Sequence, residues 1–167
     1  MVYKIRLILD TEEDVLRDIA ISYNDTLEDL HNAITNAFGF YGTEMASFYT
    51  TDDNWNQGEE IPLFDMSEAN DSISMEKVTL KDILTEDNDK LIYVYDFFAM
   101  WSFFVELISI ENDENLIELP CLLFSLGTVP SEAPEKEFVG EDANSEEYES
   151  LENFDEFDFD NFDDSIN

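Results

Sequence analysis

The residues best suited to catalysis are few and scattered along the chain. His31 is the single histidine, and the two arginines, Arg6 and Arg17, fall on adjacent expected strands. A recombinase needs a Ser or Tyr nucleophile with several arginines, and a histidine triad or metal site needs partner residues. The chain has no glycine-rich phosphate loop, no His-x-x-x-His pair and no Gly-x-Ser-x-Gly elbow. We therefore expect a protein that is not an enzyme and has no cofactor, with His31 packed beside the apolar stripe of a helix.

Carboxylate-rich loops are the second place where chemistry could occur. Residues 52–54 are Asp-Asp-Asn and residues 59–60 are Glu-Glu, which supply side-chain oxygens of the kind that calcium prefers. The Asp-x-Asp-x-Asp-Gly order with its distal Glu is absent. We therefore expect solvated loop charges there and no dedicated metal site.

The charge of the chain limits its partners. The 167 residues include 42 acidic and 7 basic side chains, for a formal net charge of −35. So few cations cannot neutralise a phosphate backbone, and we expect neither direct nucleic-acid binding nor attraction to anionic membranes. A basic protein surface is the favoured partner, because opposite charges speed encounter and make binding sensitive to salt.

The cellular location of the protein is predicted from its cysteine content and from one apolar segment. Cys121 is the single cysteine, which excludes a disulfide within the chain and fits a reducing compartment. Residues 91–110 are apolar enough to be considered as a membrane span, but Asp96 and Glu106 lie inside them. Since a charge near the centre of a span is costly, we expect a cytoplasmic protein without a membrane segment.

The chain changes character near Pro130 and Pro134. Residues 131–167 carry 15 acidic residues and one lysine, with few aliphatic side chains. Such a segment cannot bury enough apolar surface to offset its ordering entropy. We expect a folded domain at residues 1–130 and a disordered acidic tail at residues 131–167.

The tail interleaves aromatic rings with acids, a composition typical of disordered segments that dock in a groove on a basic partner. A tail that only aids solubility is the alternative, but it has no need of exposed phenylalanines. The expected contact residues of the tail are Phe154, Phe157, Phe159 and Phe162 with Asp155, Asp158 and Asp160.

The folded part reads as a β-hairpin followed by an amphipathic helix. Residues 2–9 and 15–22 alternate as strands, and residues 24–30 carry a cap residue with an acid three positions later. An apolar stripe at helical spacing follows and Gly39 ends it. We expect an α+β fold of β-grasp (ubiquitin-like) type: a mixed sheet, one main helix and an added C-terminal hairpin strand. Its other expected elements are strands at 46–51 and 61–66, a short helix at 79–84, strands at 91–97 and 102–110, and an apolar stretch at 119–126.

The connection between the last two expected strands is unusually apolar. It comprises Phe98, Ala99, Met100 and Trp101, where tight turns favour Gly, Asn or Asp. Exposed aromatic and Met side chains mark interaction sites. Either residues 119–126 fold over this tip or a partner covers it. We include Phe98, Met100 and Trp101 among the expected partner-binding residues.

Several short segments form a set whose order and spacing are specific. They are YKIRL at residues 3–7, TLEDLH at 26–31 leading to AFGF at 37–40, VTLKDIL at 78–84, and LIYVYDF at 91–97 with Trp101. Taken together, these segments resemble the plasmid pRiA ORF-three-like family, which also carries the label insertion-element passenger TnpR family. The resemblance covers about residues 1–110 and implies an α+β domain with a ubiquitin-like order of elements. It implies no particular reaction, and the TnpR label indicates a link to mobile elements rather than recombinase activity.

The chain departs from that family at its polar positions. Members run Tyr-Asp-Phe-Gly-Asp-Gly-Trp between the last two strands, with a histidine two places after the tryptophan. Here residues 98–100 replace Gly-Asp-Gly, Phe103 stands at the histidine position and Cys121 is alone. We therefore carry no ligand or metal role over to this chain.

Together these features predict a non-enzymatic protein-interaction module whose acidic, Phe-bearing tail and apolar hairpin tip engage a basic protein. One alternative is a nucleic-acid mimic, whose acids imitate phosphates and occupy a DNA- or RNA-binding protein. Another is an enzyme of unrecognised type, which would need a pocket where His31 meets a carboxylate. The sequence predicts neither the partner's identity nor the oligomeric state.

Overall fold

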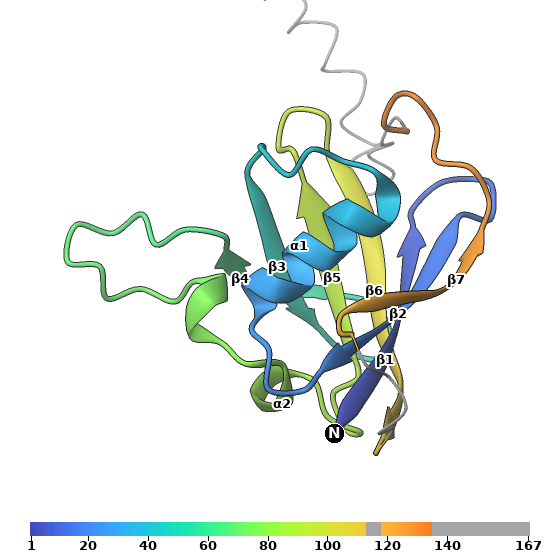
Figure 1. Ribbon diagram of the computed structural model, residues 1–167. Coiled ribbons are helices and arrows are strands. Elements are labelled where there is room, and N and C mark those ends of the chain that lie inside the picture. The colour runs from blue at the N-terminus through green and yellow to red at the C-terminus, as the bar shows by residue number, and fades with distance from the viewer. Residues whose placement is uncertain (113–117, 135–167) are drawn as a thin grey trace, which may run out of the picture. The chain divides into compact units, whose positions relative to one another are not determined.

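The computed structural model describes residues 1–112 and 118–134, which form one curved antiparallel sheet packed against a single long helix (Figure 1). The elements are β1 (Val2–Leu9), β2 (Leu16–Ser22), α1 (Leu27–Phe38), β3 (Ala46–Thr51), β4 (Gln57–Pro62), a 3₁₀ turn η1 (Met75–Lys77), α2 (Leu80–Ile83), β5 (Lys90–Tyr95), β6 (Trp101–Glu111) and β7 (Cys121–Leu126).

The predicted signals at the two ends of α1 are confirmed. Thr26 Oγ1 accepts the backbone N–H of Asp29 at 3.2 Å, and Asp29 Oδ2 accepts the backbone N–H of Thr26 at 3.0 Å. This reciprocal pair satisfies donors that the first turn would otherwise leave free. Gly39 ends the helix in the left-handed conformation, with a φ of 80°.

The expected β-grasp is wrong, although the α+β class stands. A β-grasp sheet is mixed, whereas here the seven strands follow the order β4-β3-β5-β6-β1-β2-β7 and every neighbouring pair is antiparallel. The difference arises because β6, which forms a hairpin with β5, lies between β5 and β1. β5 runs in the same direction as β1, but β6 runs in the opposite direction, so the strand that pairs with β1 is antiparallel to it.

The long strand β6 alternates strongly over its first seven residues, so one of its faces is buried in the core. Trp101, Phe103, Val105 and Leu107 face the core and are at most 8% exposed. The added hairpin strand is β6, which pairs with β5, and the apolar stretch expected at residues 119–126 forms a further strand, β7, that pairs with β2 at the edge of the sheet.

The strand expected at residues 61–66 is also misplaced. β4 covers Gln57–Pro62, and it pairs with β3 through Phe48↔Ile61 and Tyr49↔Glu60. Only Ile61 of β4 is fully buried, so its sequence carries little of the alternation that predicts a strand.

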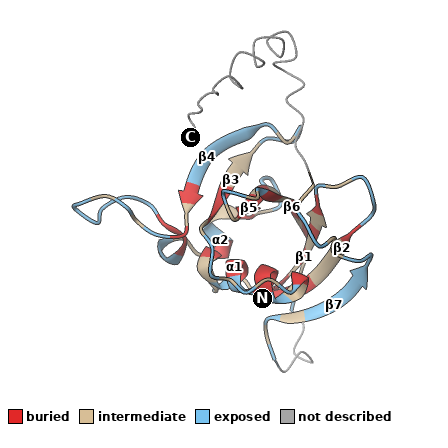
Figure 2. Cartoon of the chain, turned by 90° about the horizontal axis from the view of Figure 1, so that it is seen from above, coloured by how far each residue is buried: buried red, intermediate tan, exposed pale blue. Residues whose placement is uncertain are grey.

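The sheet curves around α1, as the view from above shows (Figure 2). The fully buried centre combines aromatic rings from the sheet with aliphatic side chains from α1. Phe103 packs 4.7 Å from Phe38 and 5.7 Å from Tyr93, centroid to centroid. These contacts hold the helix against the middle of the sheet and orient the loops at its ends.

The compact unit extends to Pro134, and Val129 and Ala133 still pack against its core. None of the helices in the described ranges combines the length and the apolar character required to cross a membrane.

Candidate functional site

Three loops meet at one end of the sheet: residues 10–15, 39–45 and 96–100. Asp10 donates its backbone N–H to Ser102 O at 2.8 Å, and Asp96 donates its own to Met45 O at 2.7 Å. We call these three loops the loop end; Figure 1 shows residues 39–45 and 96–100 next to each other at the top and residues 10–15 at the upper right. They contain no lysine or arginine, and their acidic residues are Asp10, Glu12, Glu13, Asp14, Glu44 and Asp96.

The apolar hairpin loop at 96–100 is held by its first residue. Asp96 Oδ1 accepts the backbone N–H groups of Phe98 at 3.1 Å and Ala99 at 3.3 Å. Asp96 and Met100 both adopt left-handed backbone conformations, with φ of 66° and 64°. Asp tolerates this region better than most residues, because its side chain bonds the local backbone. The Asp96 side chain therefore stabilises the loop through two backbone hydrogen bonds, and Ala99 packs partly against the core.

The expected contact residues of this loop divide into a displayed group and a core residue. Phe98 is 98% exposed and Met100 is 40% exposed, with Phe97 at 43%. Trp101 is only 8% exposed and packs 4.9 Å from the Phe40 ring. The structure thus presents Phe98 and Met100 to solvent and uses Trp101 for the fold.

The tip is not covered by residues 119–126, one of the two expected alternatives. Those residues contribute β7, which pairs along β2. Phe98 stays almost fully exposed within the described ranges. A second aromatic side chain, Tyr41, is 95% exposed in the neighbouring loop of the loop end. Sequence reasoning missed Tyr41, whose only signal was its place beside Gly42 in a turn.

The basic side chains of the described domain are already engaged. Lys4 binds Glu111, Lys77 binds Asp65, and Lys90 lies near Asp89 and Glu106. Arg6 forms a bidentate pair with Asp18, which raises the pKa of the guanidinium. Arg17 donates to backbone carbonyls, including that of Leu126 at 3.0 Å, and Lys81 donates to Asn24.

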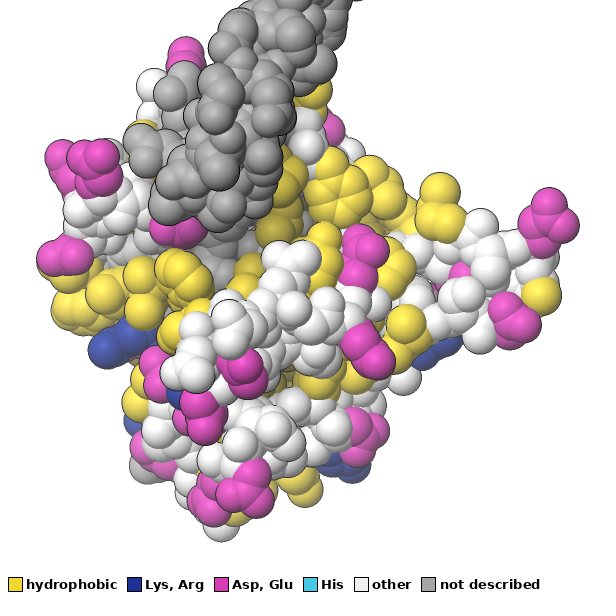
Figure 3. Space-filling model, turned by 180° about the vertical axis from the view of Figure 1, so that it is seen from behind, with side chains coloured by type: hydrophobic (Ala, Val, Ile, Leu, Met, Phe, Trp, Pro, Cys, Tyr) yellow, Lys and Arg dark blue, Asp and Glu magenta, His cyan; other side chains and the backbone are white. Residues whose placement is uncertain are grey.

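The surface left to a partner is therefore acidic. The view from behind shows Asp and Glu side chains spread over the face with few Lys or Arg among them (Figure 3).

His31 is buried between α1 and the sheet, next to Tyr93. The imidazole is 2% exposed, and its Nδ1 lies 2.7 Å from Tyr93 Oη. Burial lowers the pKa of His31 and raises that of Tyr93 well above its usual value. The neutral imidazole thus joins α1 to β5 inside the core, and Tyr93 is its one hydrogen-bond partner among the described residues.

The acidic loop after β3 also uses its oxygens internally. Asp52 Oδ1 accepts the backbone N–H groups of Asn54 and Asn56, and Asp52 Oδ2 accepts from the Asn56 side chain at 2.8 Å. These hydrogen bonds, led by that of the Asn56 side chain, lower the pKa of Asp52. Glu59 and Glu60 belong to β4 rather than to this loop. Among the described residues, no group of three or more His, Cys, Asp or Glu is placed to hold a metal ion.

A family model described as plasmid pRiA4b ORF-3-like protein matches residues 1–165. The chain belongs to this family. The match extends beyond residues 1–110, where the resemblance was expected. The crystal structure of a protein of unknown function, MM3350 from Methanosarcina mazei Go1, is similar to this chain with a TM-score of 0.68. It is 22% identical and covers 93% of this chain and 85% of its own, which shows the fold alone. No curated protein matches.

The positions at which the chain departs from the pRiA4b ORF-3-like pattern are now located. Phe103, at the expected histidine position, is fully buried beside Phe38 and Tyr93. Residues 98–100, in place of Gly-Asp-Gly, form the apolar part of the loop end. Phe103 therefore contributes to core packing, and Phe98 and Met100 contribute exposed apolar surface.

The tail half of the expected contact surface lies outside the described residues, so its docking role stays a prediction. The residues concerned are Phe154, Phe157, Phe159, Phe162, Asp155, Asp158 and Asp160.

Proposed function

We propose that this protein is a non-enzymatic interaction module whose loop end binds a basic protein surface that offers an apolar pocket. The observation that carries the proposal is the display of Phe98. Phe98 is 98% exposed on the 96–100 loop, whose backbone is held by the Asp96 side chain, and the loops of the loop end carry acidic but no basic residues.

An exposed aromatic ring on a hydrogen-bonded loop backbone is a suitable anchor for binding. Aromatic side chains dominate interface energetics when they enter a desolvated pocket. A fixed loop also avoids part of the ordering cost of association. The surrounding carboxylates would select a basic partner and exclude acidic ones. The Phe-bearing tail would add a second contact to the same partner, and the reducing cytoplasm suits the free thiol of Cys121.

The test uses the full chain as bait, followed by titration of each captured protein after purification. Phe98→Ser should weaken binding at least tenfold, and serine at the four tail phenylalanines should weaken it further. Met66→Ser is the matched control, because Met66 is 78% exposed on a different loop. The proposal fails if the captured proteins are not basic. It also fails if Phe98→Ser binds as well as the Met66→Ser control.

The nucleic-acid mimic is a second candidate, favoured by one observation. Each described Lys and Arg side chain is held by an acid, an amide or a backbone carbonyl of the chain itself, which leaves the acids to face solvent. In that case charge alone would drive binding, so the serine variants would bind normally and a DNA or RNA duplex would compete for the partner.

A further inference from the structure

The two edges of the sheet differ in how they are protected. An edge strand exposes unpaired backbone groups, and natural proteins shield such edges with charges, prolines or bulges. The β4 edge carries Glu59, Glu60 and Pro62. The β7 edge reads Cys-Leu-Leu-Phe-Ser-Leu and has no charged residue in a chain with a net charge of −35.

The side chains of β7 are apolar and open to solvent. Leu122, Leu123, Phe124 and Leu126 are 52, 41, 49 and 45% exposed. The strand ends the sheet order, so one of its sides has no partner strand among the described residues. A register shift opposite Asp18 and Ile19 interrupts its pairing with β2.

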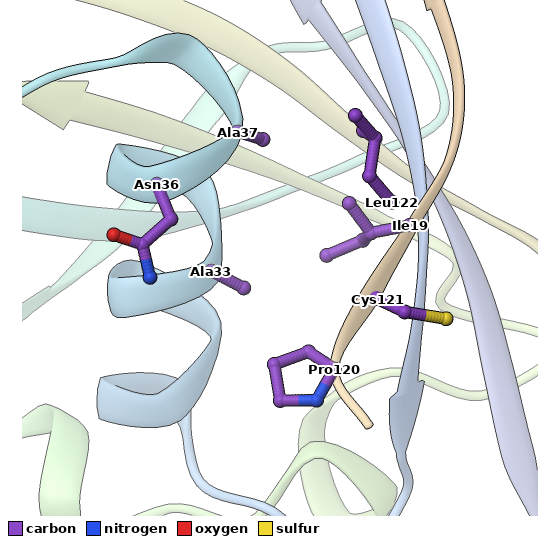
Figure 4. Close-up of a pocket in the computed structure, with 7 residues that line it drawn as sticks. All are labelled: Ile19, Ala33, Asn36, Ala37, Pro120, Cys121 and Leu122. Carbon is purple, nitrogen blue, oxygen red and sulfur yellow. The ribbon is translucent and has the colours of Figure 1, made fainter. Parts of the chain in front are cut away.

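The apolar surface continues beside the strand as a cavity of about 180 Å³ between α1 and β7 (Figure 4). Ala33 and Ala37 line it from the helix, and Leu122 and Pro120 line it from the β7 side. Asn36 supplies the one polar side chain of the lining other than the Cys121 thiol. The strand and the cavity together form one uncharged strip, which we call the β7 strip.

The two charged side chains of β2 that lie next to the β7 strip are held by groups of the same chain. Arg17 on β2 donates to the carbonyl of Leu126, and Asp18 is neutralised by Arg6 at 2.8 Å. Two copies of this chain repel each other over most of their surface, because each carries a net charge of −35. The repulsion between two copies is least where both contacting surfaces are uncharged. This is the case when the β7 strip of one copy contacts the β7 strip of the other.

We propose that a second copy of this chain is the partner of β7, with the two β7 strands pairing antiparallel about a two-fold axis. An isologous contact needs a surface that is complementary to itself. An uncharged strand with apolar side chains and a free backbone edge meets that need. This surface is separate from the loop end, so the inference does not depend on the proposed function.

Sedimentation of the full chain over a range of concentrations tests the pairing. Because salt screens the repulsion but leaves the apolar contact, association should strengthen by tenfold or more between about 0.05 and 0.5 M salt. Phe124→Lys should weaken the dimer at least tenfold. Phe64→Lys is the matched control, since Phe64 is 52% exposed on another loop and Phe124 is 49% exposed.

A second measurement guards against a Phe124→Lys variant that fails to fold. In a Cys121→Ser background, Leu123→Cys, Phe124→Cys and Ser125→Cys, each introduced alone, should give an intermolecular disulfide at the positions that face each other across the two-fold axis. A chain that stays monomeric at high salt and high concentration overturns the inference. Equal weakening by the two lysine variants, or the absence of any disulfide at these positions, also overturns it.

Discussion

Replacement of Asp96 tests whether its side chain holds the backbone of the 96–100 loop. The Asp96 carboxylate accepts two backbone N–H groups, and its φ of 66° is a conformation that Ala adopts at a cost. Each hydrogen bond contributes about 0.5–1.5 kcal/mol. A left-handed Ala costs about 1–2 kcal/mol. Asp96→Ala should therefore lower the free energy of unfolding by roughly 2–5 kcal/mol.

Two further substitutions separate these contributions. Asp96→Asn keeps an acceptor oxygen and tolerates the left-handed region, so its cost should stay near 1 kcal/mol. Asp96→Gly keeps the conformation but loses both hydrogen bonds to the side chain, and its cost should be about 1–3 kcal/mol. Urea denaturation gives the free energies, and amide hydrogen exchange at Phe98 and Ala99 reports the loop itself. An Ala variant as stable as the Asn variant, with unchanged exchange at both amides, would refute this account.

Three other substitutions test the core, its pH dependence and the anchoring of β7. Phe103→Ala should cost about 3–5 kcal/mol in urea denaturation, because the ring is fully buried, whereas Phe98→Ala should stay within about 0.5 kcal/mol. Burial lowers the pKa of His31 in the folded state, so the neutral form is the one that folding favours. Stability from this group is therefore complete above the unfolded pKa near 6.5 and is lost as pH falls through the folded pKa, by up to about 1.4 kcal/mol per pH unit. His31→Phe should reduce this loss between about pH 7.5 and 5.5 when unfolding free energies are compared, and equal pH profiles would contradict the assignment. Gly127→Ala should release the end of β7, because its Cβ would lie 2.1 Å from Asp14 O at a φ of 84°. A thermal midpoint within a degree of the wild type would count against this close approach.

Elements with a local signal were predictable from the sequence. The capping pair Thr26 and Asp29, the apolar stripe and Gly39 lie within a few residues of one another, so α1 could be bounded correctly. β4 lacked such a signal because pairing with β3, and not its own alternation, makes it a strand. The strand was expected at residues 61–66, too far toward the C-terminus, because Ile61 is the one buried residue of β4 and lies near its end.

The sheet order required information that no single segment contains. Two consecutive strong strands, β5 and β6, were expected, but either could have lain beside β1. The structure inserts β6 there, with Leu7 opposite Val105. This choice depends on how well whole faces pack, which periodicity does not report. The antiparallel sheet follows from it.

The candidate site was predictable in part for a similar reason. The exposure of Phe98 follows from its place in a hairpin turn. The burial of Trp101 could have been read from the alternation of Trp101, Phe103, Val105 and Leu107 along one strand. Residues 98–101 were expected to form one apolar tip, but β6 already begins at Trp101. The β7 strip had the plainest signal, an uncharged segment in an acidic chain, but its place at a sheet edge was visible only in the structure.

The dependence on salt concentration distinguishes the interaction at the loop end from the interaction at the β7 strip. Attraction between the acidic loop end and a basic partner weakens as ions screen it, with a Debye length that falls from about 30 Å at 0.01 M to about 3 Å at 1 M. Repulsion between two copies is screened by the same ions, so contact through the β7 strip should strengthen. Titration of the partner and sedimentation of the free chain should therefore change in opposite directions over the same salt series. If both interactions weakened together, charge attraction would also be holding the copies together, and the assignment of the uncharged strip as their contact would be wrong.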